Sequence, residues 1–460
     1  MSLYKACDIR GPVEELSPEL YRTWGRALGN RVGPGATFLA GGDVRLTTPG
    51  FLAALISGLA EAGARVVDLG VLPTPMAYFA GRHLGAPGVA VVTASHSPPG
   101  INGLKWTVDE LPPTEAEILA LQRSVEEGLA GPRRPGGSRT TFDPAPSYRD
   151  WLCRRWQGTA VTGKAIVDPG SGCWSGRAAP LLAAAFPGLK VEAIHDLPDG
   201  LFRARNPDSA RPEHLTALIA AVVEQGADLG IAFDGDGDRV SLVDEEGVVL
   251  SPEETAWILV QGLAGEWPGR VFVYDLKCSS RIPEEVRRLG GTAEPQRSGH
   301  AFIRTRMIER QALFGAEISG HYFYGELRGG DDGLFTACRV LAGWAAGGRS
   351  LAAMRRACPA IHATPDLRLV VPAEEQEAVL ARVRSAFAEW PQSTLDGVRL
   401  EFPDGWALAR RSVTAAELTF RFEGDSRSSL DRIVREFASR IGGLGERLEA
   451  AYQTQKAGTP

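Results

Sequence analysis

Short apolar runs that end in polar, glycine-rich turns recur along most of this 460-residue chain. Residues 37–40, 65–69 and 89–92 have the pattern of buried strands, and stretches that predict helices lie between them. Strands that alternate with helices indicate a parallel α/β sheet. The same theme returns twice further along the chain, so we interpret it as a distant internal repeat of one α/β unit.

A chain of this length exceeds what one hydrophobic core supports, so we expect several domains. The predicted fold class is α/β, with three similar mixed α/β domains followed by a smaller α+β C-terminal domain, because the last region clusters its strands between two helices. The expected limits are residues 1–146, 147–250, 251–360 and 361–460. A Gly-, Pro-, Arg- and Ser-rich stretch at 129–146 predicts a linker, and residues 451–460 predict a frayed end.

The composition excludes several classes of function. A net charge of −6 supplies no basic surface for nucleic acid or for an anionic membrane. No stretch is long and apolar enough to span a bilayer, and residues 1–11 lack the apolar core of a signal peptide. The 6 cysteines are scattered, which is typical of a reduced cytoplasm and of neither a disulfide framework nor a zinc site. We therefore expect a cytoplasmic protein with no nucleic-acid or membrane partner.

The strongest metal signal is Asp234-Gly-Asp-Gly-Asp-Arg239, which follows a predicted strand at 228–233. Three carboxylates this close repel one another unless a cation lies among them, and the glycines let the backbone curl so that they converge. Oxygen ligands indicate Mg²⁺ or Ca²⁺. An EF-hand loop does not fit, because Arg239 stands where that loop needs glycine and strands flank the segment. The alternative is a solvated acidic turn.

A second polar turn, Thr93-Ala-Ser-His-Ser-Pro-Pro-Gly100, follows the apolar run at 89–92. The carboxyl ends of strands are where α/β proteins place their ligands, which makes Ser95 a candidate functional residue. Mg²⁺ usually takes a phosphate oxygen beside its protein ligands, and a phosphorylated Ser95 would supply one. Taken alone, the segment could equally be a serine-rich loop that needs only its turn residues.

Basic side chains recur near the ends of predicted strands, although each alone could be a solvated surface charge. Lys105 and His300 could move the proton of a hydroxyl during phosphoryl transfer. The Gly-rich loop at 168–176 could hold a phosphate at a helix N-terminus, but we favour a tight turn there. The candidate contacts for an anion or substrate are Arg10, Arg45, Lys105, Arg239 and Lys277.

Two later segments carry polar side chains at alternate positions. In an extended 317–321 segment such side chains would face one side and could bind sugar hydroxyls; an amphipathic strand edge is the alternative. The 410–414 segment offers a guanidinium and two hydroxyls, a set suited to a phosphate, although in isolation it is only a polar turn. The residues are Glu317, Ser319 and His321 in the first segment and Arg410, Ser412 and Thr414 in the second.

Taken in chain order, these motifs resemble those of the α-D-phosphohexomutases. The start, Asp8-Ile-Arg-Gly11, resembles the phosphomannomutase/phosphoglucomutase branch in particular. The resemblance covers the whole chain and implies four domains around a central cleft, the fourth closing over the substrate. It implies interconversion of the 1- and 6-phosphates of mannose or glucose through a phosphoserine and a hexose 1,6-bisphosphate. The motifs are Ala94-Ser-His-Ser-Pro98, Asp234-Gly-Asp-Gly-Asp-Arg239, Gly315-Ala-Glu-Ile-Ser-Gly-His321 and Arg410-Arg-Ser-Val-Thr414.

Residue by residue, the resemblance implies a phosphoserine at Ser95 and Mg²⁺ held by its phosphate and by Asp234, Asp236 and Asp238. A small phosphosugar is the expected partner, and a monomer or weak dimer is the expected state. Ser97, Val413 and Ala416 depart from the family, which usually has Asn, Asn and Pro there; the last two predict a weaker phosphate contact. The implied roles are catalysis for Ser95, Lys105, His300 and Arg10; sugar binding for Arg239, Lys277, Glu317, Ser319 and His321; and phosphate binding for Arg410, Ser412 and Thr414.

Three other functions compete with this interpretation. Phosphoglucosamine mutases usually carry a Gly-Thr-Asp-Gly-Ile-Arg-like start and a Gly-Thr-Glu-Pro-like phosphate loop, and this chain has neither. A metal-dependent phosphatase would stop at hydrolysis and would need no sugar reorientation. A sugar-phosphate-binding protein would need neither Ser95 nor the acidic triplet. Mannose and glucose differ at one hydroxyl, so both remain as substrates.

Overall fold

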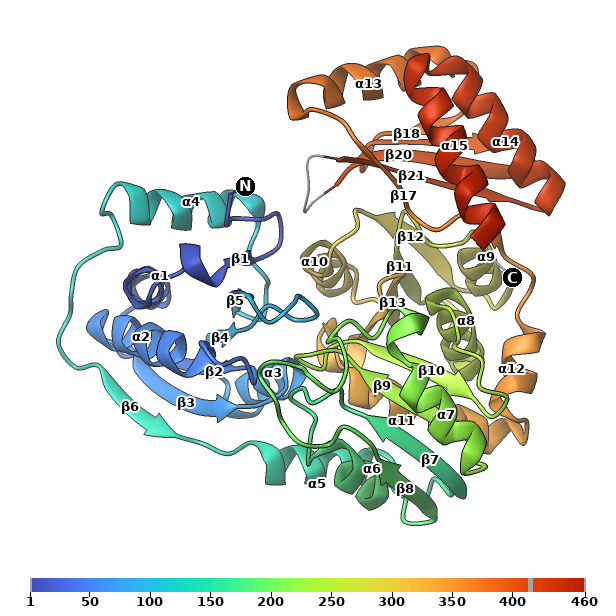
Figure 1. Cartoon of the computed structure of the whole chain (residues 1–460). Coiled ribbons are helices and arrows are strands. Elements are labelled where there is room, and N and C mark those ends of the chain that lie inside the picture. Colours follow the sequence, from blue (N-terminus) through green and yellow to red (C-terminus); the bar gives the residue numbers. More distant parts are fainter. Residues whose placement is uncertain (1, 413–416, 459–460) are drawn as a thin grey trace.

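A computed structural model describes residues 2–412 and 417–458. Within this part of the chain the strands form four sheets, each accompanied by its own helices (Figure 1). The first three sheets mix parallel and antiparallel strands, and the fourth is antiparallel. This confirms the predicted fold class, although the sheets are not purely parallel. We number the domains 1 to 4 after their sheets; the residue limits expected from the sequence stay a prediction.

Domain 1 has strand order β1-β5-β4-β2-β3-β6. Residues 129–146 are not only a linker, since they contain β6 and the start of α5. β6 escaped prediction because its four polar residues are exposed at the sheet edge. The strands are β1 (Ile9–Pro12), β2 (Thr37–Gly42), β3 (Arg65–Val71), β4 (Gly88–Val92), β5 (Ile101–Val108) and β6 (Ser138–Thr141), and the helices are η1 (Val13–Glu15), α1 (Pro18–Val32), α2 (Thr48–Glu61), α3 (Thr74–Leu84) and α4 (Glu115–Glu126). The next helix, α5 (Ala145–Arg155), connects domains 1 and 2 and packs on both α3 and α6.

The central strands of domain 1 are buried on both faces, which explains their continuous apolar runs. Successive side chains point to opposite faces, so Leu39, Val89 and Val91 pack with α3 and α5. Phe38 and Val92 join the core formed with α1 and α2. β5 runs antiparallel to β4, with Val91 opposite Lys105. That hairpin places Lys105 beside the loop that follows β4.

Domains 2 and 3 repeat this arrangement. In domain 2, β9 and β10 form an antiparallel hairpin whose connection is the acidic motif. The elements of domain 2 are β7 (Gly163–Asp168), α6 (Ala178–Ala185), β8 (Leu189–Ala193), η2 (Pro212–His214), α7 (Thr216–Glu224), β9 (Leu229–Phe233) and β10 (Val240–Asp244). Those of domain 3 are α8 (Pro252–Gly262), η3 (Ala264–Glu266), β11 (Val271–Asp275), α9 (Arg281–Arg288), β12 (Thr292–Gln296), α10 (His300–Arg310), β13 (Phe314–Glu317), β14 (His321–Tyr324), η4 (Gly325–Leu327), β15 (Gly330–Asp331), α11 (Gly333–Gly347) and α12 (Leu351–Ala357).

Domain 4 is an antiparallel sheet covered by helices. The expected frayed end is wrong as far as Gly458, because α15 continues to that residue and its Tyr452 packs into the domain core. The elements are β16 (His362–Ala363), β17 (Leu367–Val370), α13 (Ala373–Ala386), β18 (Gln392–Ser393), β19 (Val398–Phe402), β20 (Gly405–Arg411), β21 (Glu417–Gly424), α14 (Arg427–Arg440) and α15 (Gly443–Gly458).

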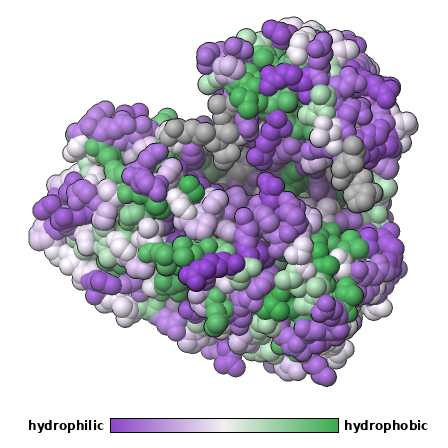
Figure 2. All heavy atoms as spheres, viewed as in Figure 1, coloured by the Kyte–Doolittle hydropathy of each residue, from purple (hydrophilic) through white to green (hydrophobic). Residues whose placement is uncertain are grey.

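Although each domain has its own sheet, the domains do not each have a separate hydrophobic core. One large core joins domains 1, 2 and 3 and includes Tyr148, Trp174, Phe233 and Phe335. Domain 4 has a separate core from Leu367 to Tyr452. Figure 2 shows a hollow between domain 1 and domain 4, and the atoms that line it are mostly hydrophilic. The cleft expected from the sequence is therefore bordered by three domains with a common core and by a fourth with a core of its own, which meets domain 3 where Leu276 packs on Trp406 and Leu408.

Candidate active site

Many of the side chains singled out in the sequence lie on loops or at the ends of strands, whereas Arg10 and Lys105 lie within β1 and β5. Ser95 follows β4, the motif Asp234–Arg239 joins β9 to β10, Lys277 follows β11, and Glu317 ends β13. Strand ends of this kind meet in the crevice of α/β sheets. Ser95 Oγ donates a hydrogen bond to Asp234 Oδ2 at 2.8 Å, so domains 1 and 2 touch at these two residues.

Ser95 has a left-handed backbone, with φ of 52°. This conformation is strained for a residue other than glycine and persists where the surroundings enforce it. Ser95 N donates to Thr93 Oγ1 at 2.9 Å, and Thr93 Oγ1 donates to Asp43 Oδ2 at 2.8 Å. The strain thus falls on the residue that the sequence marked as the reactive one.

The guanidinium of Arg45 fixes the same loop. Arg45 is 1% exposed and forms an ion pair with Asp43 at 2.9 Å. The expectation that Arg45 contacts a bound anion or substrate is wrong, because Asp43 and the main chain already take its donors. The acceptors are the carbonyl oxygens of Ser95 (2.9 Å), Ser97 (2.6 Å), Pro98 (2.7 Å) and Ile101 (2.9 Å).

In the acidic triplet, both oxygens of Asp234 and one oxygen each of Asp236 and Asp238 are engaged by the protein. Asp234 Oδ1 accepts from the backbone N–H groups of residues 237 and 239 at 3.0 and 3.2 Å. Lys105 Nζ donates to Asp236 Oδ2 at 2.9 Å and to Asp238 Oδ2 at 2.5 Å. Asp236 Oδ1 and Asp238 Oδ1 are buried without a hydrogen-bond partner among the described residues. Buried anionic oxygens are costly when unpaired, and these donors, with ligand atoms within 4.8 Å of one another, fit a hard divalent cation.

The charged groups of the cluster shift one another's pKa values. Burial favours a neutral Lys105, but Asp236 and Asp238 outweigh it and raise the pKa of Lys105 well above its usual range. Burial, together with the negative charges of Asp238 and Asp236, raises the pKa of Asp234 to about 8. Lys105 and the guanidinium of Arg239, whose Nε lies 3.9 Å from Asp234 Oδ2, supply two positive charges beside three carboxyl groups, and a bound cation would favour the ionised form of all three.

The Gly-rich loop at 168–176 donates hydrogen bonds to the backbone of the acidic loop. It is the tight turn that the sequence favoured, with Gly172 N donating to Pro169 O at 2.9 Å. Cys173 N donates to Gly235 O at 3.0 Å, and Trp174 Nε1 donates to Gly237 O at 2.9 Å. The backbone of the acidic loop is therefore held in shape by its neighbour in the same domain.

His321 joins the acidic loop to domain 3. Its Nδ1 lies 2.7 Å from Asp331 Oδ2, and Arg239 Nε donates to its Nε2 at 2.9 Å. The expected extended segment at 317–321 is wrong, because residues 318–320 form the turn between β13 and β14. Glu317 and His321 are instead opposite partners in that hairpin, so they still share a face.

His300 and Arg10 lie beside this group. The His300 and His321 ring centroids are 6.1 Å apart, and His300 Nε2 is buried without a hydrogen-bond partner among the described residues. Burial, and then the charge of Lys105, lower the pKa of His300 to about 4. Arg10 forms an ion pair with Asp8 at 2.6 Å and donates to Ser97 Oγ at 3.2 Å. A neutral imidazole and a protonated lysine are thus available at the same site.

The remaining predicted residues lie further along the cleft. Lys277 Nζ donates to Asp366 Oδ2 of domain 4 at 3.3 Å. Arg410 forms an ion pair with Asp396 at 2.9 Å, and Asp396 also accepts from the backbone N–H of Ser298 at 3.2 Å. Lys277 of domain 3 and Arg410 of domain 4 therefore both lie where these two domains meet. Glu317 is buried, and Ser319 Oγ has no hydrogen-bond partner among the described residues. In domain 4, Ser412 N donates to Glu417 O. Thr414, Val413 and Ala416 lie outside the described residues.

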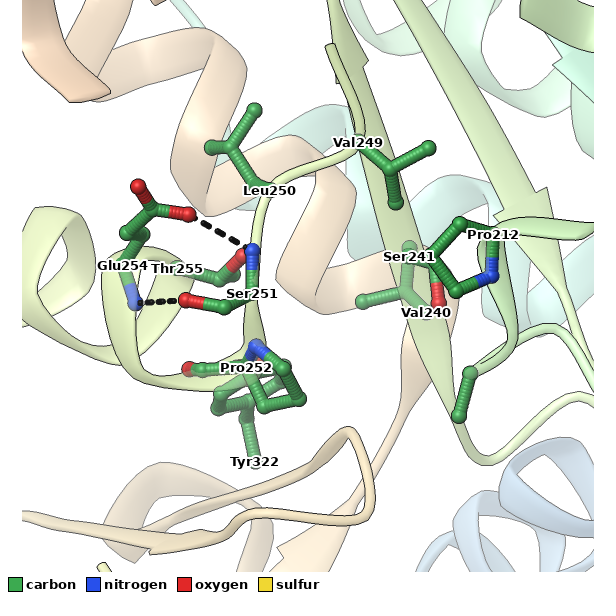
Figure 3. A pocket seen from close by; sticks show the side chains of 11 residues that line it. Pro212, Val240, Ser241, Val249, Leu250, Ser251, Pro252, Glu254, Thr255 and Tyr322 are labelled. Carbon is green, nitrogen blue, oxygen red and sulfur yellow. Dashed lines mark hydrogen bonds between the residues drawn. The ribbon is translucent and has the colours of Figure 1, made fainter. Parts of the chain in front are cut away.

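A separate pocket of about 250 Å³ lies behind the contact between domains 2 and 3 (Figure 3). Its lining includes Val240 and Tyr322, the neighbours of Arg239 and His321 in the chain. Several of its polar groups are already used: the Ser251 hydroxyl accepts from Glu254 N at 3.1 Å, and the Glu254 carboxylate accepts from Ser251 N at 2.7 Å. The chemistry therefore concentrates at the serine and acidic loops and not here.

Sequence reasoning missed Asp331, Thr74 and Asp43, which hold site residues in place. Asp331 lies in Gly329-Gly-Asp-Asp-Gly333, which indicated only a helix start. Thr74 donates to Asp236 Oδ2 at 2.7 Å, and nothing in its Pro-Thr-Pro context marks that contact. Asp43 and Arg45 follow a predicted strand, and that placement was a usable signal.

The fold and this cluster define a multidomain α/β protein in which a strained serine meets an acidic triplet. In the part of the chain described, no helix has the length and apolar character needed to cross a membrane. The family profiles for phosphoglucomutase/phosphomannomutase alpha/beta/alpha domains I, II and III match residues 1–128, 159–247 and 251–361. The chain belongs to the phosphoglucomutase/phosphomannomutase family, as the motifs predicted.

Similar proteins match nearly end to end. The chain is 34% identical over 459 residues to a phosphomannomutase/phosphoglucomutase of Pseudomonas aeruginosa, with 98% of each chain covered. It is 32% identical over 448 residues to a phosphoglucomutase of Neisseria gonorrhoeae, covering 95% of this chain and 96% of that one. The crystal structure of a phosphoglucomutase/phosphomannomutase family protein from Burkholderia thailandensis superposes with a TM-score of 0.87 at 32% identity, covering 98% of this chain and 97% of that one.

Proposed function

We propose that this protein is a phosphohexomutase that interconverts hexose 1-phosphate and hexose 6-phosphate, with mannose or glucose as the sugar. Ser95 would carry the transferred phosphoryl group, and a hexose 1,6-bisphosphate would be the intermediate. The observation that carries the proposal is the 2.8 Å hydrogen bond from Ser95 Oγ to Asp234, made by a serine in a strained loop. Family membership supports the same chemistry.

The acidic triplet is proposed to hold Mg²⁺ together with a phosphate on Ser95. Asp236 Oδ1 and Asp238 Oδ1, which are buried without a hydrogen-bond partner among the described residues, support this assignment. When bound, the cation would neutralise charge on the phosphoryl group during transfer. Lys105 is held between Asp236 and Asp238, where its ammonium can stabilise phosphate oxygens. His300, neutral and unpaired at Nε2, is proposed to take up and return the proton of the sugar hydroxyl, with Arg10 beside the phosphate.

The other predicted residues are proposed to hold the sugar and its far phosphate. A substrate that binds in two orientations needs groups that recognise features common to both, namely ring hydroxyls and a phosphate at the far end. The separate core of domain 4 would let it close over the substrate, excluding water from the phosphoserine. The cytoplasmic location and the monomeric or weakly dimeric state stay predictions. The sugar contacts are Arg239, Lys277, Glu317, Ser319 and His321, and the phosphate contacts are Arg410, Ser412 and Thr414.

A coupled assay tests this function. Purified protein receives glucose 1-phosphate or mannose 1-phosphate with Mg²⁺ and a trace of the matching 1,6-bisphosphate. We expect the 6-phosphate to form, and Ser95→Ala to abolish its formation. Ser124→Ala, at a buried serine of α4 whose hydroxyl donates to Leu121 O, is the matched control. No isomerisation of either sugar would rule out the proposal; steady release of inorganic phosphate would indicate a phosphatase, and binding without turnover a sugar-phosphate-binding protein.

A further inference from the structure

Thr74 of domain 1 makes two hydrogen bonds to Asp236 of domain 2. Its backbone N–H donates to Asp236 O at 2.9 Å, and its hydroxyl donates to Asp236 Oδ2 at 2.7 Å. Thr74 is fully buried and begins α3, 162 positions away from Asp236 in the chain. One member of the acidic triplet is therefore fixed, at main chain and side chain, from outside its own domain.

The Thr74 hydroxyl shares its acceptor with Lys105. Lys105 Nζ donates to the same Asp236 Oδ2 at 2.9 Å. The terminal torsion of an aspartate has broad preferences, so the hydrogen-bond donors decide which oxygen points where. With both donors on Oδ2, Asp236 Oδ1 is left buried and without a hydrogen-bond partner among the described residues.

The backbone that carries Thr74 is restricted. Pro73 precedes it with φ of −61° and Pro75 follows it, and a proline ring fixes φ. Met76 N and Ala77 N donate to Pro73 O at 3.0 and 3.2 Å, so they are satisfied inside the turn. Among the N–H groups of Thr74, Met76 and Ala77, that of Thr74 donates to domain 2, where Asp236 O accepts it. The restricted backbone therefore holds the N–H and hydroxyl groups of Thr74 in fixed positions facing Asp236.

We propose that Thr74 is a positioning residue for the divalent cation of the phosphoryl-transfer site. It acts through Asp236, by holding Oδ2 so that Oδ1 stays available as a metal ligand. The inference rests on the proposed function, because that function requires the cation. Groups that orient a metal ligand typically change metal affinity by about 10–100-fold when they are removed.

The test is Mn²⁺ binding to the purified full-length protein, followed by electron paramagnetic resonance. Thr74→Val keeps the branched shape and removes the hydroxyl, whereas Thr74→Ser keeps the hydroxyl. Thr364→Val is the matched control, because Thr364 is a buried threonine of domain 4 whose hydroxyl accepts from Phe422 N at 3.1 Å. We expect Thr74→Val to bind Mn²⁺ about tenfold more weakly, and Thr74→Ser and Thr364→Val to bind it within about twofold of the wild type.

Steady-state kinetics give the second readout. Thr74→Val should need more Mg²⁺ for half its maximal rate, with little change in the phosphosugar KM at saturating Mg²⁺. Wild-type Mn²⁺ affinity in Thr74→Val, or an equal loss in Thr74→Ser, would overturn the role of Thr74 and leave the proposed function standing. If the wild type binds no Mn²⁺, the metal site of the proposed function falls as well. If Thr74→Val does not fold by circular dichroism, Thr74→Ala takes its place with the same expectation.

Discussion

Asp331 Oδ2 lies 2.7 Å from His321 Nδ1, and this contact sets which ring nitrogen of His321 accepts a hydrogen bond. With the proton on Nδ1 directed at Asp331, Nε2 is the acceptor for Arg239 Nε at 2.9 Å. Two residues proposed to contact the sugar are thus ordered by a carboxylate that belongs to neither loop.

Asp331→Asn should weaken substrate binding. The amide can present an N–H group to Nδ1, which would place the imidazole proton on Nε2, facing the Arg239 donor. We expect the KM for the phosphosugar to rise about tenfold, the value of one charge-assisted hydrogen bond. Steady-state kinetics check this, with Asp425→Asn, at an exposed partner of Arg281, as the control. An unchanged KM would show that Asp331 does not order this pair.

Arg45→Lys should destabilise the Ser95 loop. A lysine has one nitrogen where arginine has a planar fork, so it cannot serve the four carbonyl oxygens that Arg45 now contacts. Leaving buried acceptors unpaired next to Asp43 should lower the stability of domain 1 by about 3 kcal/mol. Hydrogen exchange should rise in residues 95–101 before it rises elsewhere. Wild-type protection in that loop would contradict the assignment.

Arg410→Lys should impair binding of the far phosphate. Arg410 already forms an ion pair with Asp396 at 2.9 Å, and a guanidinium can keep that contact while offering further N–H groups to a phosphate. The KM should rise about tenfold while kcat changes little, as expected for an interaction that ground state and transition state share. The neighbouring Arg411→Lys is the control, since Arg411 is 52% exposed and pairs with Glu377.

Asp332→Asn should stabilise the protein at alkaline pH and not at acid pH. Asp332 caps α11, accepting from Phe335 N at 3.0 Å and from the Tyr148 hydroxyl at 2.7 Å. Burial raises its pKa to about 6. The folded state therefore holds a proton that the unfolded chain loses above about pH 4. This contribution to stability is present below pH 4 and is lost as the pH rises through 6.

Asparagine stays neutral and remains a good helix cap. We expect Asp332→Asn to raise the free energy of unfolding of domains 1–3 by about 2 kcal/mol at pH 8 and to have almost no effect at pH 4. Thermal melts of the variant and the wild type at both pH values measure this. A difference that does not vary with pH would contradict the predicted ionisation of Asp332.

The parts of the site that lie within a single stretch of sequence were predictable. Ser95 and the acidic motif each follow an apolar run, so a strand end and its loop could be read from neighbouring residues. Lys105 was predicted as a site residue, but its place between Asp236 and Asp238 depends on how two domains pack. Thr74 and Asp331 act only through such contacts, and a single sequence gives no pattern for them.

Other errors arose where local signals competed. The segment 317–321 alternates polar residues, yet its Ser-Gly pair is a turn signal, and Gly320 has φ of 93° in the observed turn. β6 and α15 carry few apolar residues, so their polar composition predicted a linker and a frayed end. β6 forms because it pairs with β3, and α15 forms because it packs into the core of domain 4.

The contacts of Arg45 separate the main-chain path of the Ser95 loop from its side chains. Because the guanidinium holds carbonyl oxygens, which every residue carries, it recognises the path of the chain and not its side chains. At position 97 the two kinds of contact are separate: Arg45 holds the carbonyl oxygen of Ser97, whereas Arg10 donates to its side-chain Oγ, so a replacement there changes the contact with Arg10 and leaves that with Arg45 in place. Ser95 is thus held by a contact that depends on the course of the main chain, and side-chain substitutions in the loop can be tested separately from it.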